Sequence, residues 1–401
     1  MGETKKSKLE ISYIIAFSLL GIFPIVPFIV KPFLIIPLLI TSLTSLFSIQ
    51  RRSVEWKKIV ISTSIFLLFL LSSLYTDDLD RAVKLLSRLT PFLAFPICFA
   101  FVPKSIYNLL TDIFIRSFTV SCCLFGLLIF AYCISLNSTD VYYIFSELSN
   151  NFWGFEEHPI YISLYFGVAL ILLLLKSKKT LVNLIIFATI LFALLFLSRK
   201  GNIISLALVL LIILIISNTK NIVQKSYLRY YLIGLIIVIG ATFVFNDFMV
   251  DRFKELLEFD QVVGSTKTST GIRSIIWQTS LDLSAEAPII GYGLGNVQDV
   301  IDSSFVRNGY GELTLILRYN AHNQYLQIAL ISGYLGLLFF VGVLSYIFKS
   351  IKHTKFALGV FLYIIFCFVF ESFLERQNGI IITALFFNLF LFLPTKQTEN
   401  L

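Results

Sequence analysis

Long apolar runs, separated by short polar segments, make up most of the chain. A helix that crosses a membrane needs about 20 predominantly apolar residues. By that measure the pattern predicts about twelve spans, and therefore an all-α polytopic membrane protein. The spans are expected near Ile11–Val30, Phe33–Ile49, Ile59–Leu74, Leu89–Val102, Ile113–Leu136, Ile160–Leu175, Leu181–Leu197, Ile203–Ser217, Tyr230–Phe245, His322–Phe348, Phe356–Phe370 and Gly379–Leu393.

One long polar stretch, residues 246–321, interrupts this pattern. We expect it to be a loop between the ninth and tenth spans of a single membrane domain that comprises residues 1–401. Within the loop, the spacing of apolar residues predicts short helices over Asp251–Phe259 and Gly271–Ala285. Arg273 falls in the first turn of the second helix, where the helix dipole disfavours a cation. Helix stability therefore does not explain this arginine.

Composition and charge add an orientation to this picture. Hydrophobic residues make up 57% of the chain and charged residues 14%, and the mean hydropathy is +0.86. The net charge of +8 arises from Lys and Arg that concentrate in alternate loops, which the positive-inside rule assigns to the cytoplasm. That rule places residues 246–321 on the outer face, which is the periplasm in a bacterium with the protein in its inner membrane. A nucleic-acid partner is not expected, because cytoplasmic loops account for the basic balance.

The predicted location limits the chemistry, because the periplasm supplies neither ATP nor nucleotide sugars. An enzyme there must use a substrate that was activated beforehand. The glycine-rich segment Gly291–Gly295 is accordingly predicted to be a tight turn and not a dinucleotide-binding motif, since no strand precedes it. All five cysteines lie in apolar runs, which predicts neither disulfides nor a metal cluster, and no cofactor is expected.

Three residues on the predicted outer face have the chemistry of a phosphate site with a base. Arg199 lies in a short turn between two spans, Arg273 in the loop, and His322 at the start of the tenth span. Each has an ordinary structural interpretation: an interfacial arginine, an ion-paired helix residue, and a helix-cap histidine. Together, however, two guanidinium groups match a lipid-linked diphosphate, and a neutral imidazole can deprotonate an attacking hydroxyl. No metal is required if the arginines supply the positive charge.

Further charged residues compete for roles at the same surface. Arg81, Lys84 and Arg88 recur at helical spacing and could gather anionic lipid or phosphate, or form a solvated interfacial face. Glu371 is costly near lipid unless it is paired, so it could orient an arginine or act as the base. His158 is a further candidate base.

These residues, in their order along the chain, resemble the O-antigen ligase and O-antigen polymerase superfamily of bacterial membrane glycosyltransferases. The resemblance rests on Ser198-Arg199, on the late loop with Arg273, on Gly291–Gly295, and on His322–Leu326 followed by Gly333–Gly336. It is clearest from Leu181 to Leu344.

The resemblance implies a GT-C-like helical fold and transfer of a glycan from undecaprenyl diphosphate to an acceptor. The acceptor is the lipid A core in ligases and another glycan repeat in polymerases. Arg199 and Arg273 would bind the diphosphate, and His322 would activate the acceptor hydroxyl. We expect an O-antigen ligase; a polymerase, and less readily a polysaccharide transporter or flippase, are the alternatives, and a scaffold for other envelope enzymes is a third class.

Overall fold

Helices are the only regular secondary structure in the described part of the chain. The computed structural model contains helices but no strand within the described residues, which confirms the predicted all-α class. The predicted ninth span, apart from Gly240, and the start of the polar loop lie outside them, as does most of the predicted helix Asp251–Phe259. The structure describes residues 7–48, 54–138, 140–155, 157–178, 180–216, 240, 250, 254–255, 258–315 and 318–394.

Nine apolar helical segments within the described residues indicate a multi-pass membrane protein. Four are long and apolar enough to cross a membrane, and five more are apolar but shorter. The total of about twelve spans and the GT-C-like arrangement stay predictions. The long segments are Phe28–Ser45, Leu79–Ala100, α6 (Lys104–Ser135) and α17 (Gln324–Ile351); the shorter ones are α8 (Pro159–Leu175), α9 (Leu181–Phe196), α10 (Lys200–Ile216), α18 (Lys355–Phe370) and α19 (Gln377–Leu391).

Some helices extend beyond the predicted apolar spans, because polar residues add helical turns at their ends. Helix α6 begins directly after Pro103, well before the predicted Ile113, because proline favours a helix start and polar residues extend the helix beyond the apolar run. Similarly, α4 (Leu79–Leu89) carries the predicted basic stripe and leads into α5 (Pro91–Ala100). Hydropathy alone locates the apolar part of such helices and misses their polar ends.

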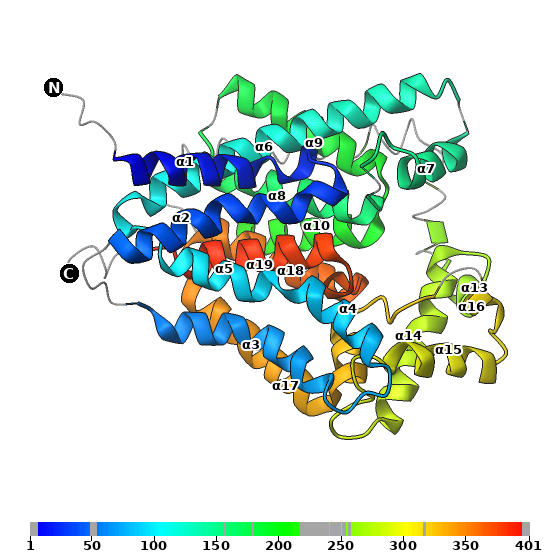
Figure 1. The fold of residues 1–401 in the computed structure, drawn as a ribbon. Helices are drawn as coiled ribbons and strands as arrows, with labels where there is room; N and C mark the ends of the chain where they lie inside the picture. Colours follow the sequence, from blue (N-terminus) through cyan, green and yellow to red (C-terminus); the bar gives the residue numbers. More distant parts are fainter. Residues whose placement is uncertain are drawn as a thin grey trace.

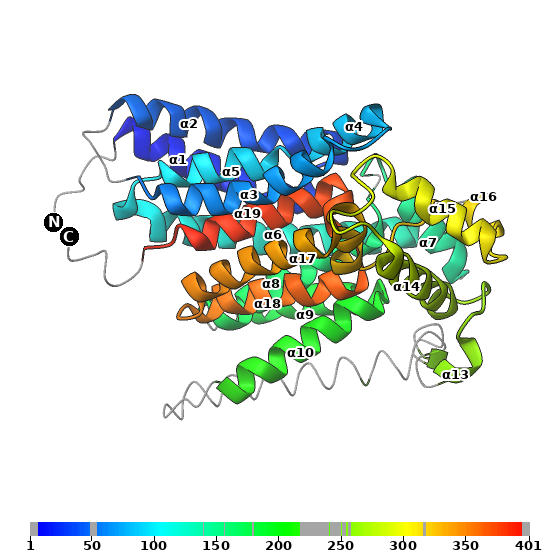
Figure 2. The same cartoon turned by 90° about the horizontal axis from the view of Figure 1, so that it is seen from below.

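The helices of the polar loop gather at one end of the bundle. Figures 1 and 2 show α14 (Ser269–Glu286) and α15 (Val297–Arg307) beside the short α13 (Phe259–Val262) and α16 (Glu312–Leu315), all at the same end. The start of α1 (Lys8–Gly21) and the end of α19 lie at the opposite end. The remaining described helices are α2 (Ile35–Ser48), α3 (Trp56–Ser72) and α7 (Val141–Asn150), with 3-10 turns η1 (Phe23–Ile25), η2 (Phe28–Leu34) and η3 (Phe373–Glu375).

The glycine-rich segment docks the loop onto the bundle by backbone contact. Helix α17 is broken at Gly333, whose φ of 68° is in the left-handed region. The opposing segment donates from Tyr292 N to Leu330 O at 2.8 Å and from Gly293 N to Ile331 O at 3.0 Å. A Cβ atom on Gly333 would overlap the carbonyl of Ile289. These contacts agree with the predicted structural role of the segment.

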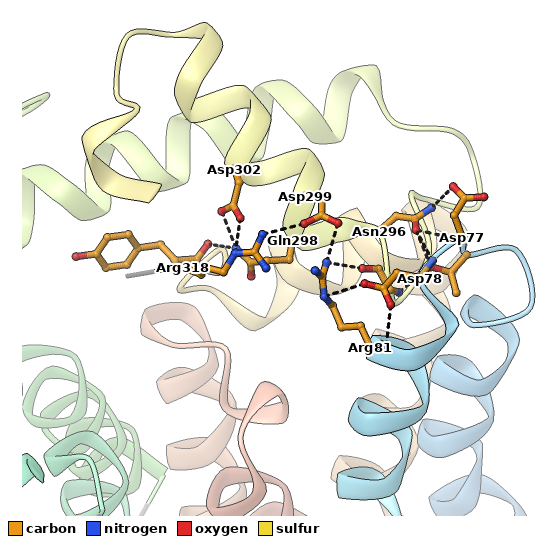
Figure 3. Close-up of polar contacts among 11 residues, drawn as sticks. Asp77, Asp78, Arg81, Asn296, Gln298, Asp299, Asp302 and Arg318 are labelled. Carbon is orange, nitrogen blue, oxygen red and sulfur yellow. Dashed lines mark hydrogen bonds and ion pairs between the residues drawn. The ribbon is translucent and has the colours of Figure 1, made fainter. Parts of the chain in front are cut away.

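Side-chain contacts fix the same loop to the connection between α3 and α4. The Asn296 carboxamide oxygen accepts from Thr76 Oγ1 at 2.9 Å and from the backbone nitrogens of Asp77 and Asp78 at 3.0 and 3.2 Å. Arg81 reaches Asp299 on α15 at 2.9 Å (Figure 3). The loop is therefore attached to the bundle at two separate places.

Replacing Gly333 with Ala is expected to destabilise the protein. Left-handed backbone costs a residue with a Cβ about 1–2 kcal/mol, and the overlap with Ile289 adds to that cost. Thermal unfolding of the purified protein should show a midpoint several degrees lower than wild type. The matched control is Gly342→Ala in the same helix, where nothing lies within 4 Å of the added Cβ and no loss is expected. Equal stability of the two variants would contradict the docking interpretation.

Candidate active site

The structure brings the three predicted residues to one cavity. Arg199 lies in the turn between α9 and α10, Arg273 on α14, and His322 immediately before α17. All three line a cavity of about 190 Å³, together with Glu371 and His158. Arg273 is the fifth residue of its helix, just beyond the first turn in which it was predicted, because the helix begins at Ser269 and not at Gly271. The chemical roles of these residues stay predictions.

Two residues beside this cavity have strained backbone. Ser198, next to Arg199, has a φ of 52°, and His322 itself has a φ of 42°. Positive φ is uncommon in residues other than glycine and persists only where surrounding contacts enforce it. At His322, the backbone nitrogen donates to Asn320 Oδ1 at 3.0 Å, and the Trp277 indole donates to its carbonyl oxygen at 3.2 Å. These contacts fix the direction of the imidazole.

His322 and Glu371 form a buried pair. The imidazole Nδ1 lies 2.9 and 2.8 Å from the two carboxylate oxygens of Glu371, whose side chain is only 8% exposed. A carboxylate partner requires the proton on Nδ1, so a neutral imidazole carries its free lone pair on Nε2. The expected pairing of Glu371 is present, but its partner is a histidine and not an arginine.

The electrostatic surroundings keep Glu371 ionised. Burial raises the pKa of its carboxyl group, but His322 and then Arg273 and His158 outweigh that effect, and the net pKa lies below the usual range. The carboxylate is therefore negative at neutral pH and is available to stabilise a protonated His322.

Lys200 and Glu255 attach α14 to the turn that carries Arg199. The buried Lys200 ammonium donates to Glu255 Oε2 and to Thr270 Oγ1, both at 2.9 Å. The same carboxylate oxygen accepts from Thr270 N at 3.3 Å and Ser269 Oγ at 3.1 Å, at the positive end of the α14 dipole. This pair therefore joins the start of the helix that carries Arg273 to the turn that carries Arg199. Neither Lys200 nor Glu255 was predicted as a site residue, although Lys200 is adjacent to Arg199.

A second, larger cavity lies on the other side of the pair. It has a volume of about 550 Å³ and shares His322, Glu371, His158, Tyr319 and Ile160 with the smaller cavity. His322 therefore faces two compartments at their junction. Arg88, predicted as a substrate-binding residue, lines this larger cavity and not the one that contains Arg199 and Arg273.

The predicted basic stripe is divided by the structure. Arg81 pairs with Asp78 at 3.3 Å and with Asp299 at 2.9 Å, and its guanidinium also donates to the Gly295 carbonyl at 2.9 Å. It therefore supports the loop, while Arg88 reaches the larger cavity. The spacing that predicted a common helix was right, but it could not show which partners each arginine would meet.

His158 contributes to both cavities as a weak base. Its imidazole is exposed to them, yet the surrounding protein atoms lower its pKa to about 4, and the charge of Arg199 adds to the effect. The preceding Glu157 is fully buried, where it pairs with Lys31 and accepts from Asn378 Nδ2 at 2.7 Å. That buried pair was not predicted, because Lys31 and Glu157 lie 126 positions apart in the chain. It fixes the start of α8 and one wall of the larger cavity.

A metal site is not formed within the described residues: no three His, Cys, Asp or Glu side chains are grouped to hold an ion there. Metal independence stays a prediction.

Comparison with known families identifies the central part of the chain. A family model described as O-antigen ligase matches residues 164–341, which confirms the predicted resemblance over that segment. The match includes Arg199, Arg273 and His322, while Arg88 and Glu371 lie outside it. No curated protein matches the chain.

The Lys200–Glu255 pair predicts that Glu255→Ala loosens the start of α14. The change removes an acceptor of charged hydrogen bonds, which contribute about 1.5–3 kcal/mol each. Amide hydrogen exchange in the first turn of α14 should accelerate about 10-fold or more. Glu286→Ala, at the exposed end of the same helix, is the control and should leave that turn unchanged. Unaltered exchange in Glu255→Ala would show that the pair does not hold the helix.

Proposed function

Because residues 164–341 match the O-antigen ligase family, we propose that this protein is a membrane glycosyltransferase using an undecaprenyl-diphosphate-linked glycan. One observation carries the proposal: the His322–Glu371 pair lies where a cavity with two arginines meets a larger cavity. A transferase needs such an arrangement, because the donor and the acceptor must approach the base from different sides.

The smaller cavity suits the diphosphate of the donor. Arg199, Lys200 and Arg273 supply three positive side chains at its walls. Guanidinium groups bind phosphate oxygens in pairs and remain charged at all relevant pH values. The planar, forked guanidinium groups make the two arginines the principal groups for the diphosphate. They also take the place that a divalent cation has in metal-dependent enzymes.

The reaction would proceed with His322 as general base. The acceptor hydroxyl oxygen attacks the anomeric carbon of the donor sugar, and His322 Nε2 accepts the hydroxyl proton. The bond between the anomeric carbon and the diphosphate oxygen breaks, and the electron pair leaves on undecaprenyl diphosphate. Arg199 and Arg273 stabilise the negative charge that develops there. Glu371 holds the reactive tautomer and stabilises the imidazolium that forms.

We propose an O-antigen ligase of the inner membrane that acts on the periplasmic face, with the lipid A core as acceptor. A polymerase of the same superfamily would use the same donor cavity and differ in its acceptor. A transporter or flippase has weaker support, because transporters place ionisable groups near mid-membrane. Here the candidate residues share a cavity with residues of α14, one of the loop helices that lie at one end of the bundle (Figure 2). A pure scaffold would not need two cavities that meet at a histidine.

Loss of Arg273 or His322 is expected to abolish transfer. Removing one stabilising cation or the base costs about 100-fold or more in rate. In a deletion strain that carries Arg273→Ala or His322→Ala, undecaprenyl-linked glycan should accumulate as full-length chains. Accumulation of single repeats would instead identify a polymerase. The exposed His353→Ala and Arg307→Ala variants are controls, and wild-type transfer by Arg273→Ala and His322→Ala would refute the assigned roles.

The Glu371→Gln variant tests the contribution of the Glu371 carboxylate while His322 is retained. The amide can occupy the same space but cannot stabilise an imidazolium, so kcat should fall about 100-fold with little change in KM. A merely structural glutamate would leave kcat of the folded enzyme unchanged. Glu286→Gln, on the exposed surface, should keep the wild-type kcat and KM.

A further inference from the structure

Arginine, amide and aromatic side chains line the larger cavity. Three arginines, Arg88, Arg318 and Arg376, line it beside the amide side chains of Asn320, Gln377 and Asn378. Aromatic rings of Phe28, Tyr161 and Tyr319 complete the walls. Amides and rings are groups that contact sugar hydroxyls and sugar faces, and its volume of about 550 Å³ is ample for a saccharide unit.

Two of the three arginines retain unbalanced charge. Arg318 is neutralised by Asp299 at 3.0 Å and Asp302 at 2.9 Å (Figure 3). Within the described residues, by contrast, no carboxylate oxygen lies within 4.0 Å of Arg88 or Arg376. Arg88 donates to the backbone carbonyl of Glu375 at 3.5 Å, and Arg376 directly precedes α19.

The nearby carboxylates do not remove this excess. Glu371, the one carboxylate among the described residues of the cavity wall, is engaged by His322. Burial raises the pKa of the Glu375 carboxyl group to about 7, so at neutral pH it is only partly ionised. Arg88 and Arg376 thus add positive charge to the wall of a cavity that His322 also lines.

We propose that the larger cavity binds an anionic saccharide as the acceptor, with its carboxylate or phosphate on Arg88 and Arg376. The sugar ring contacts the amides and tyrosines, and its free hydroxyl faces His322. This inference rests on the proposed transferase function and specifies the substrate class of its acceptor side. Arginine is suited to this task because its planar group binds either anion in a bidentate manner.

Binding to the purified full-length protein without donor tests the inference. Saturation-transfer NMR would compare glucuronic acid and glucose 6-phosphate with neutral glucose, in phosphatidylcholine nanodiscs. Both anionic probes should bind about 10-fold more tightly than glucose. The double variant Arg88→Gln/Arg376→Gln should lose this preference while keeping its thermal stability. Arg307→Gln removes an exposed arginine that lines neither the smaller nor the larger cavity and should keep the preference.

Three results would overturn the proposal. Equal binding of glucose and the anionic probes would show that the cavity does not select charge. Loss of the preference in Arg273→Gln, but not in the double variant, would place the probes in the diphosphate site. Loss of the preference when phosphatidylglycerol replaces phosphatidylcholine would assign the arginines to a lipid headgroup. These binding measurements contain no donor. Their outcome is therefore independent of whether transfer requires Arg273 and His322, which the variants in the deletion strain test.

Discussion

The buried carboxylate of Glu371 is the constraint on which the site depends. A carboxylate that is almost removed from water must be paired or it becomes strongly destabilising. Here the partner is His322, whose backbone is held in a left-handed conformation by Asn320 and Trp277. The pair therefore connects the end of α18 to the start of α17 and to the loop helix α14. In the proposed reaction, it would also determine which imidazole nitrogen meets the substrate.

The polar loop functions as a docked part of the fold. Backbone contacts at Gly333 and the Asn296 side chain attach it to the bundle, and the Lys200–Glu255 pair attaches the start of α14. Together these contacts join the elements that carry Arg273 and Arg199, which line the same cavity. Under the proposed function, the catalytic geometry would depend on such supporting contacts.

The sequence allowed the helical class, the polar loop and the three central residues to be predicted, because apolar runs and isolated charges are visible in one dimension. It did not allow the partner of Glu371 to be predicted, since His322 lies 49 positions earlier in the chain. The pair of Lys31 with Glu157 could not be predicted for the same reason: only the fold brings the two residues together. Helix ends such as that of α6 were misplaced because polar turns extend apolar helices.

The proposed arrangement of donor, base and acceptor can be tested with a structure of the protein that has undecaprenyl diphosphate bound. The diphosphate is expected in the smaller cavity, in contact with the guanidinium groups of Arg199 and Arg273 and on the side of the cavity that His322 lines. The larger cavity should remain open for the acceptor. A diphosphate bound by Arg88 and Arg376 in the larger cavity, or outside both cavities, would contradict the proposed arrangement of donor, base and acceptor.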